Sequence, residues 1–237
     1  MRLSLIIPAH NEEAYLPETL RCVSAARKNI PDLELIVVDN ESTDATRAIA
    51  EKAGATVLTE TIRNIAQVRN TGAAASSGEV LIFLDADTHV RPTTLEQIAA
   101  AMEDPRCLGG SVRVEYTPST RWWVRPYLMG WEFWGHVMRM HQGAAQFVRR
   151  DAFEQLGGYD TSIYVGEDIQ LVQRLKKLAR TRRGYTTFID RPRVLSSSRR
   201  FTKMSIPRIL MLTNPIAILL FWRARSLWTD WYDQPPR

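Results

Sequence analysis

Short apolar runs alternate with amphipathic segments along the first part of the chain. Each run is about five residues long and rich in Val, Ile and Leu, as in strands buried on both faces of a parallel sheet. The runs are Leu3–Ile7, Glu34–Val38, Ala55–Thr59 and Val80–Leu84. The segments with helical spacing between them are Glu12–Lys28, Ser42–Ala53 and Pro92–Met102. This alternation predicts an α/β fold with a doubly wound, mostly parallel sheet flanked by helices.

The pattern changes after Pro105. Leu108–Tyr116 is expected to form a longer strand, and residues 121–140 are dense in aromatic side chains and predicted to be helical. Further on, the spacing predicts a helix over residues 167–179 and strands at Tyr185–Ile189 and Arg193–Ser197. No repeat or low-complexity linker separates the two parts, so we predict a single continuous domain. Its parts are residues 1–105 and 106–200, which share one mixed sheet, followed by an apolar, aromatic tail at 201–237.

The tail does not fit a membrane-spanning helix. Its apolar stretch, Ile206–Trp222, is interrupted by prolines, Arg208 and Asn214. A bilayer span needs roughly 20 uninterrupted apolar residues. Arginines and tryptophans near both ends are typical of a segment that lies at a membrane interface. A helix docked on the protein body and a dimer contact remain the alternatives.

Composition and charge narrow the class of protein. The chain is 45% hydrophobic and 24% charged, which is ordinary for a folded domain. Its two cysteines fit a reducing compartment, and its N-terminal apolar run is short for a signal peptide. We therefore expect a cytoplasmic protein, with peripheral contact to the inner face of the membrane through the tail.

Charge is distributed unevenly. Residues 1–105 hold 9 Lys/Arg and 16 Asp/Glu, whereas residues 174–208 hold 12 Lys/Arg and one acid. The basic region indicates an anionic partner, such as ligand phosphates, nucleic acid or a lipid surface, or else a solvated basic helix face.

The clearest chemical signal is Asp85-Ala86-Asp87, which follows the apolar run Val80–Leu84. Ligands of open α/β sheets bind at the carboxyl ends of strands. Two carboxylates there suit Mg²⁺ or Mn²⁺, which neutralises a departing diphosphate. A solvated turn is the alternative, because aspartate is common in turns. Among the histidines, His89, His136 and His141 are candidates for completing the metal shell, although a lone histidine is more often a surface or core residue.

Other acids also stand at element ends. Asp39 follows Glu34–Val38, where it is suited either to a nucleobase or ribose, or to capping the next helix. Glu167 and Asp168 precede a predicted helix, where they are suited either to general-base chemistry or to stabilising the helix dipole. The first run is followed by acidic residues, and no Gly-x-Gly-x-x-Gly follows any strand, which argues against a dinucleotide fold.

The order and spacing of these motifs resemble family 2 glycosyltransferases of the GT-A fold. The resemblance covers roughly residues 1–200. It rests on Leu5–Glu13 (LIIPAHNEE), Val37–Thr46 (VVDNESTDAT), Asn64–Gly72 (NIAQVRNTG), Leu81–Thr88 (LIFLDADT) and Gly143–Leu175 (GAAQF…GGYD…GEDIQLVQRL).

The resemblance implies a role for each matching residue. Residues 1–105 would form the nucleotide-sugar-binding half and residues 106–200 the acceptor-binding half. Asp168 would be the catalytic base, with Glu167 beside it, and Asp85 and Asp87 would hold the metal, Mg²⁺ or Mn²⁺. The implied nucleotide-binding residues are Pro8, Ala9, Glu12, Asp39, Asn64, Arg69, Asp85 and Ala86. The implied acceptor-site residues are Gly143 and Ala144, with Trp131 from the aromatic segment as a stacking candidate, and the implied diphosphate-binding residues are Arg199 and Arg200.

We therefore predict an inverting enzyme that moves one sugar from a UDP- or GDP-type donor to a hydroxyl acceptor, with a lipid among the candidate acceptors. No nucleic-acid partner is expected. Two departures bear on this prediction. Asn40 stands where many relatives have a second acid, and the Gln-x-x-Arg-Trp motif of processive relatives is missing, which favours a single transfer.

Two other functions compete. A sugar-phosphate nucleotidyltransferase also uses a strand-end acid pair, but the acidic segment His10–Glu13 suits a triphosphate poorly. A non-catalytic sugar- or lipid-binding module would have no need for the intact set of Asp85, Asp87 and Asp168.

Overall fold

The computed structural model describes residues 1–28, 30–118, 121–130, 143–199, 201, 206, 209 and 223–224. The strands are β1 (Leu3–Ala9), β2 (Leu33–Asp39), β3 (Thr56–Thr59), β4 (Val80–Leu84), β5 (Thr88–His89), β6 (Cys107–Tyr116), β7 (Ala145–Arg149) and β8 (Tyr185–Ser196). The helices are α1 (Leu16–Arg27), α2 (Thr46–Lys52), α3 (Ile65–Ala75), α4 (Thr94–Glu103), α6 (Arg150–Gln155) and α7 (Glu167–Thr181). Residues 124–130 are also helical.

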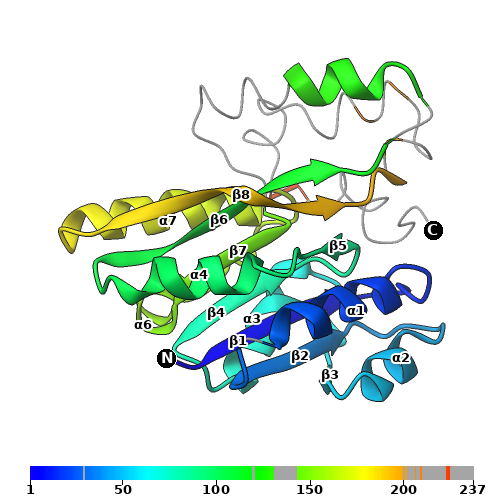
Figure 1. Cartoon of the computed structure of the whole chain (residues 1–237), viewed down its shortest axis with the longest axis horizontal. Coiled ribbons are helices and arrows are strands. Elements are labelled where there is room, and N and C mark those ends of the chain that lie inside the picture. The colour runs from blue at the N-terminus through cyan, green and yellow to red at the C-terminus, as the bar shows by residue number, and fades with distance from the viewer. Residues whose placement is uncertain are drawn as a thin grey trace.

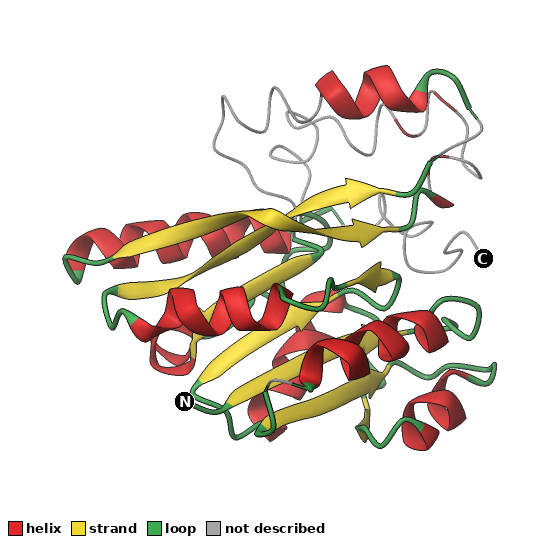
Figure 2. Cartoon of the chain, in the orientation of Figure 1, coloured by secondary structure: helices red, strands yellow, loops and turns green. Residues whose placement is uncertain are grey.

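All eight strands belong to one mixed sheet, in the order β3-β2-β1-β4-β7-β6-β8-β5 (Figures 1 and 2). The neighbours β3, β2, β1 and β4 run parallel, whereas β7 is antiparallel to both β4 and β6. The sheet therefore continues across residue 105, and the prediction of a mixed α/β sheet flanked by helices is confirmed.

Helices cover both faces of the sheet. Leu3, Leu5 and Ile7 of β1 pack in one apolar cluster with α1 and α4, while Ile6 of β1 packs in a second cluster with α3 and α7. β4 alternates in the same way between the two clusters. Burial on both faces explains why these strands are continuous apolar runs rather than alternating ones.

Several element boundaries differ from the predicted ones. The helix α3 and the strand β7 were not predicted, and α2 begins at Thr46 rather than near Ser42. The two strands expected at 185–189 and 193–197 form one strand, β8, which pairs in parallel with β6 along most of its length.

A third, smaller apolar cluster lies beyond the main sheet. Val124, Phe201 and Ile209 are its buried members, and Tyr116 and Tyr127 pack against it. Most of the tail, including 210–222, lies outside the described residues. Within the described part of the chain, no helix is long and apolar enough to cross a bilayer.

The packing of α3 on the sheet depends on Gly72. A Cβ atom at this position would lie 2.4 Å from Ile6 Cγ2 and 2.9 Å from Val38 Cγ2, which is closer than real Cβ contacts. Both neighbours are buried in the sheet, so neither can move away freely. Gly72 therefore sets how closely α3, which carries Arg69, approaches β1 and β2.

We predict that Gly72→Ala lowers the free energy of unfolding by about 1–3 kcal/mol through overpacking. Helix propensity alone predicts the opposite sign, a gain of about 1 kcal/mol for alanine over glycine. Urea unfolding would measure the change. Ala74→Gly, at an exposed position of the same helix, is the control for propensity. A stabilised Gly72→Ala variant would contradict the close packing of α3.

Candidate active site

The carboxyl ends of β1, β2 and β4 meet at one edge of the sheet. Ala9, the last residue of β1, pairs with Asp39, the last residue of β2. Asn40 N–H donates to Ala9 O (2.8 Å), which keeps the two loops together beyond the strands. Asp39 is buried, and its Oδ1 accepts from Ser42 N–H (3.2 Å). This contact belongs to a turn and not to a helix cap, because α2 begins only at Thr46.

The loop that contains the two aspartates follows β4 and is fixed at several points. Asp85 N–H donates to Ala144 O (3.1 Å), and Thr88 N–H donates to Asp85 O (3.0 Å). Thr19 of α1 donates its hydroxyl to Ala86 O (2.7 Å), within the protein interior. The loop conformation is therefore set by contacts with both parts of the chain.

Arg69 connects this loop to the start of α7. Its Nη2 donates to Asp85 Oδ1 (2.8 Å), and its Nη1 donates to Glu167 Oε1 (2.6 Å). The arginine and Glu167 side chains are 3% and 8% exposed, whereas Asp85 is 34% exposed. One cation thus holds two acids that are 82 positions apart in the sequence, and only Asp85 reaches solvent appreciably.

The environment keeps Arg69 charged. Burial by itself would lower the pKa of the guanidinium, but the neighbouring carboxylates raise that pKa above its ordinary value. The guanidinium also lies over the Tyr159 ring, 5.3 Å from its centroid, which adds a cation–π contact. Arg69 Nε is buried without a hydrogen-bond partner among the described residues.

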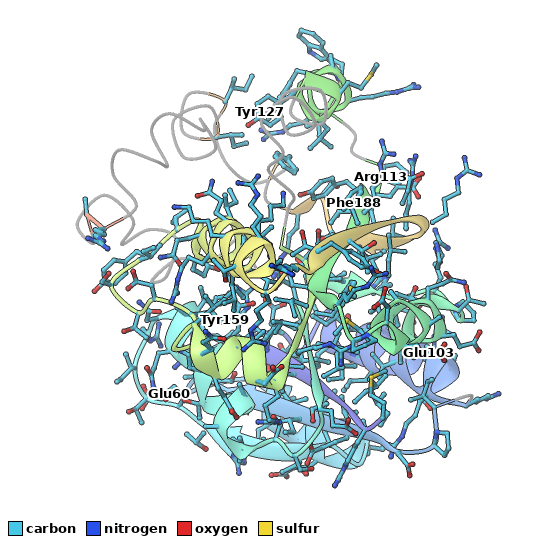
Figure 3. All side chains as sticks on the ribbon, turned by 90° about the vertical axis from the view of Figure 1, so that its left-hand side faces the viewer. Glu60, Glu103, Arg113, Tyr127, Tyr159 and Phe188 are labelled. Atoms are coloured by element: carbon cyan, nitrogen blue, oxygen red, sulfur yellow. The ribbon has the colours of Figure 1, made fainter. Side chains whose placement is uncertain are left out.

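Tyr159 (Figure 3) supports the site through its contact with the Arg69 guanidinium. It is fully buried, and its hydroxyl donates to Gln146 Oε1 (2.9 Å). Gln146 Nε2 in turn donates to Asp168 O (3.0 Å). This chain of bonds ties the first turn of α7 to β7. Neither Tyr159 nor Gln146 was predicted as a site residue from the sequence. The signals that were available are a polar Gln inside an apolar strand and an aromatic residue directly after Gly157-Gly158.

The entry to α7 separates two adjacent acids. Gly166 has a positive φ of 83°, which glycine adopts without strain, and the helix begins at the next residue. Glu167 then pairs with Arg69, while the Asp168 side chain lies against Gly143. A Cβ at position 143 would lie 2.3 Å from Asp168 Oδ2, so only glycine fits beside this carboxylate.

Asp168 has a strongly altered proton affinity. Burial and the charge of Glu167 raise the pKa of its carboxyl to about 7, although Arg69 and the hydrogen bond from Ile169 N–H (2.7 Å) oppose the rise. A carboxylate with this pKa is suited to accepting a proton near neutral pH.

A second arginine, Arg199, contacts the Asp85–Asp87 loop through Asp87. Arg199, which follows β8, donates from Nη1 to Glu12 Oε2 (2.8 Å), and its Nε lies 3.1 Å from Asp87 Oδ2. It also stacks over the Tyr15 ring, 4.5 Å from the centroid. Burial raises the pKa of the Glu12 carboxyl, and the hydrogen bonds from Arg199 counteract that rise. The basic C-terminal part of the chain therefore neutralises acids at the strand ends.

The remaining predicted residues fall into three groups. Pro8 and Ala9 lie within β1, beside β2. Asn64 caps α3 by accepting from Gln67 N–H (3.1 Å) and donates to Thr161 O (3.0 Å), so its visible role is structural. Trp131 and Arg200 lie outside the described residues, as do His136 and His141.

The two aspartates fit a hard divalent cation. Each side chain offers carboxylate oxygens, and each is now paired with an arginine. Among the described residues, no third His, Cys, Asp or Glu completes a ligand cluster with them. Mg²⁺ and similar ions are often held by one or two carboxylates together with substrate phosphates and water. The residues present therefore suit an ion that binds together with a phosphorylated ligand.

Solved structures of similar fold are glycosyltransferases. The mannosyltransferase PcManGT from Pyrobaculum calidifontis, in complex with GDP-Man and Mn²⁺, superposes with a TM-score of 0.65 at 20% identity, covering 95% of this chain and 72% of that chain. TarS 1–349 of S. aureus, in complex with UDP-GlcNAc, superposes with a TM-score of 0.64 at 16% identity, covering 84% of this chain and 59% of that chain. At these identities the likeness supports the GT-A fold alone.

Curated proteins with similar sequences are longer than this chain. Undecaprenyl-phosphate 4-deoxy-4-formamido-L-arabinose transferase of Pseudomonas fluorescens is 35% identical over 120 residues, covering 47% of this chain and 35% of the relative. Glycosyltransferase AglE of Haloferax volcanii is 26% identical over 190 residues, covering 73% of this chain and 60% of the relative. The chain thus spans less than two thirds of either relative.

The family model described as glycosyl transferase family 2 matches residues 4–157, which include β1 to β7 and both aspartates of the strand-end motif. With the sheet order and the strand-end acids described above, this match identifies the chain as a glycosyltransferase that belongs to glycosyl transferase family 2.

Proposed function

We propose that the enzyme is an inverting glycosyltransferase that moves one sugar from a UDP- or GDP-sugar to a hydroxyl acceptor. A divalent cation would bind at Asp85 and Asp87, and Asp168 would act as general base. The observation that carries this proposal is the pairing of Arg69 with both Asp85 and Glu167. It brings the strand-end acids of the proposed donor half next to the acid at the start of α7 in the proposed acceptor half.

The donor nucleoside would lie across the carboxyl ends of β1 and β2. Asp39 and Glu12 are buried acids at this edge, where a carboxylate accepts hydrogen bonds from base N–H or ribose hydroxyl groups. Pro8 and Ala9 supply adjacent backbone. The structural neighbours TarS and PcManGT are in complex with UDP-GlcNAc and GDP-Man, respectively. These complexes support a nucleotide diphosphate sugar as donor and are compatible with either base.

The diphosphate would lie over the Asp85–Asp87 loop. A bound Mg²⁺ or Mn²⁺ there would supply positive charge to the departing diphosphate. Arg199 would leave its contact with Asp87 and turn toward the phosphates, because the bidentate guanidinium suits phosphate as well as carboxylate. Arg200 would reinforce this positive charge. The structural neighbour PcManGT, in complex with GDP-Man and Mn²⁺, supports a divalent ion.

Asp168 would take the proton of the acceptor hydroxyl as its oxygen attacks the anomeric carbon. Attack comes from the face opposite the leaving diphosphate, so configuration at that carbon inverts, and an α-linked donor gives a β-linked product. Glu167 would keep Arg69 in place beside the base. Gly143 would let the carboxylate keep its position at the proposed acceptor site, because any side chain at residue 143 would collide with Asp168.

The acceptor would be a lipid-linked or other hydroxyl compound, bound near Gly143, Ala144 and the aromatic segment that contains Trp131. Relatives named as undecaprenyl-phosphate transferases support a lipid. A peripheral position on the cytoplasmic face of a membrane would bring the enzyme to such an acceptor. Trp122 and Met129, which are 86% and 62% exposed, support such a contact from the described part of the aromatic segment.

Nucleotide binding provides the first test. We expect UDP or GDP, at about a hundred times its Kd, to raise the melting temperature by about 5–10 °C in the presence of Mn²⁺. The Mn²⁺-dependent part of this shift should disappear in Asp87→Asn. Asp32→Asn, an exposed acid ahead of β2, should behave as wild type. If neither nucleotide stabilises the protein, the donor assignment is wrong, and pyrophosphate release from a nucleoside triphosphate would favour a nucleotidyltransferase.

The second test concerns the base. Asp168→Asn keeps the shape of the side chain but cannot accept the proton, so kcat should fall by about 10²–10⁴-fold while the nucleotide-induced thermal shift stays unchanged. Asp151→Asn is the matched control, because Asp151 is also an acid in the first turn of a helix. A fully active Asp168→Asn enzyme would contradict the base assignment. It would point to an acceptor, such as a lipid phosphate, whose nucleophilic oxygen is already ionised.

The third test is the pH dependence of kcat/KM. Asp168 works as a base only when it is ionised, and its pKa is raised to about 7. We therefore expect kcat/KM to increase with pH up to about 7 and then to level off. Acceptor titrations across this range, with the nucleotide affinity measured in parallel, would check the result. A profile that stays flat from about pH 5 upward would show that the carboxyl has an ordinary pKa.

A further inference from the structure

Three side chains of different chemistry from α1 and β5 lie close together. Glu18 and Cys22 lie one turn apart on α1, and His89 is the second residue of β5. One potential metal-ligating atom from each of the three lies within 4.8 Å of the others. The Cys22 thiol itself is 3.8 Å from Glu18 Oε1. Within the described residues, this is the one group of three such ligands.

The polar contacts of His89 are incomplete among the described residues. Its Nε2 is buried and has no hydrogen-bond partner among the described residues. Buried polar nitrogens are nearly always paired, so an unpaired one calls for an explanation. A metal ion bound to the imidazole would provide it.

The set of donor atoms indicates which ion would bind. A thiolate sulfur, an imidazole nitrogen and a carboxylate oxygen are the ligand types of zinc sites, whereas Mg²⁺ and Mn²⁺ prefer oxygen. In a tetrahedral zinc site, the bond lengths place ligand atoms about 3.3–3.8 Å apart. The distance of 3.8 Å between the Cys22 thiol and Glu18 Oε1 already lies at the upper end of this range, and the other separations, which are within 4.8 Å, need to contract by at most about 1–1.5 Å.

We propose that Glu18, Cys22 and His89 form a binding site for Zn²⁺, with water as the fourth ligand. This site is separate from the one at Asp85 and Asp87.

The present partner of Glu18 does not prevent metal binding. Arg21 donates to both carboxylate oxygens of Glu18, but the two side chains are 69% and 47% exposed. An exposed ion pair of this kind contributes little to stability. Arg21 can turn into solvent when Zn²⁺ takes one of the carboxylate oxygens.

The site would hold α1 against the back of the donor loop. Thr19, which lies between the two α1 ligands Glu18 and Cys22, already donates its hydroxyl to Ala86 O. His89 follows Asp87 by two residues. Zn²⁺ bound to both elements would add a second connection between α1 and this loop. The two ions would thus bind to residues of one short segment, 85–89.

Cobalt provides a spectroscopic probe. Co²⁺ bound to a thiolate shows a sulfur-to-metal charge-transfer band that oxygen ligands cannot produce. We expect this band when Co²⁺ is added to the reduced, full-length protein, and we expect Zn²⁺ to abolish it by displacement. Cys22→Ser should remove the band and weaken Zn²⁺ binding by at least about tenfold. Asp87→Asn should retain the band, because the donor-side ion is bound elsewhere.

Glu51→Gln is the matched control, since Glu51 is an exposed helical acid paired with Arg47 as Glu18 is paired with Arg21. It should leave the band unchanged. Alkylation of the wild-type protein gives a test that needs no variant. Zn²⁺ should slow modification of Cys22, with the buried Cys107 as internal reference. The proposal would be overturned by a wild-type protein without the band, by a band that survives in Cys22→Ser, or by equal alkylation of Cys22 with and without Zn²⁺.

Discussion

The site depends on one buried arginine that forms ion pairs with two acids. Arg69 of α3 pairs with Asp85 at the end of β4 and with Glu167 at the start of α7, so three elements from distant parts of the chain share one cation. Loss of one partner from a buried ion pair typically costs about 3–5 kcal/mol, because it leaves a charge without compensation. The proposed metal loop and the proposed base therefore cannot move independently of each other.

The same logic explains the uneven charge along the chain. The acidic N-terminal part gathers carboxylates where its parallel strands end, and repulsion among them would open this edge. Arg69 and Arg199 neutralise two sides of the cluster, and Arg199 comes from the basic C-terminal part. When a cation and a phosphorylated ligand bind, they can replace these arginine–carboxylate contacts with little change in the net charge of the site. The replacement is possible because carboxylate and phosphate make similar bonds to guanidinium. The ion pairs thus neutralise the carboxylates at this edge before ligands bind.

Fold and family fix the reaction class, but not the substrates. The proposed nucleotide-binding residues stand at the strand ends, whereas the proposed acceptor-binding residues lie in segments outside the sheet, where loops commonly carry specificity. One of these proposed segments, the aromatic stretch around Trp131, lies outside the described residues, and the relatives reported above are longer than this chain.

The sequence by itself determined the strands that hold the donor edge. β1, β2 and β4 are short apolar runs buried on both faces, so their positions were predicted almost to the residue, and the acids that follow them were recognised from that placement. α3 was missed because IAQVRNTGAAA has few large apolar residues, and its close packing relies on Gly72. β8 was divided in two because Arg191-Pro192-Arg193 breaks the apolar pattern, although pairing with β6 carries the strand through.

Only the tertiary structure decided which charges meet. Nothing in local periodicity links Arg69 to Glu167, Arg199 to Glu12, or Cys22 to His89, since each pair is separated by dozens of residues. Tertiary surroundings then changed what these groups do: burial raises the proton affinity of Asp168, and the carboxylates beside Arg69 keep its guanidinium charged against the effect of burial. Hydrophobic pattern is a property of neighbouring residues and can be read along the chain, whereas electrostatic partnership depends on distance and solvent access in three dimensions.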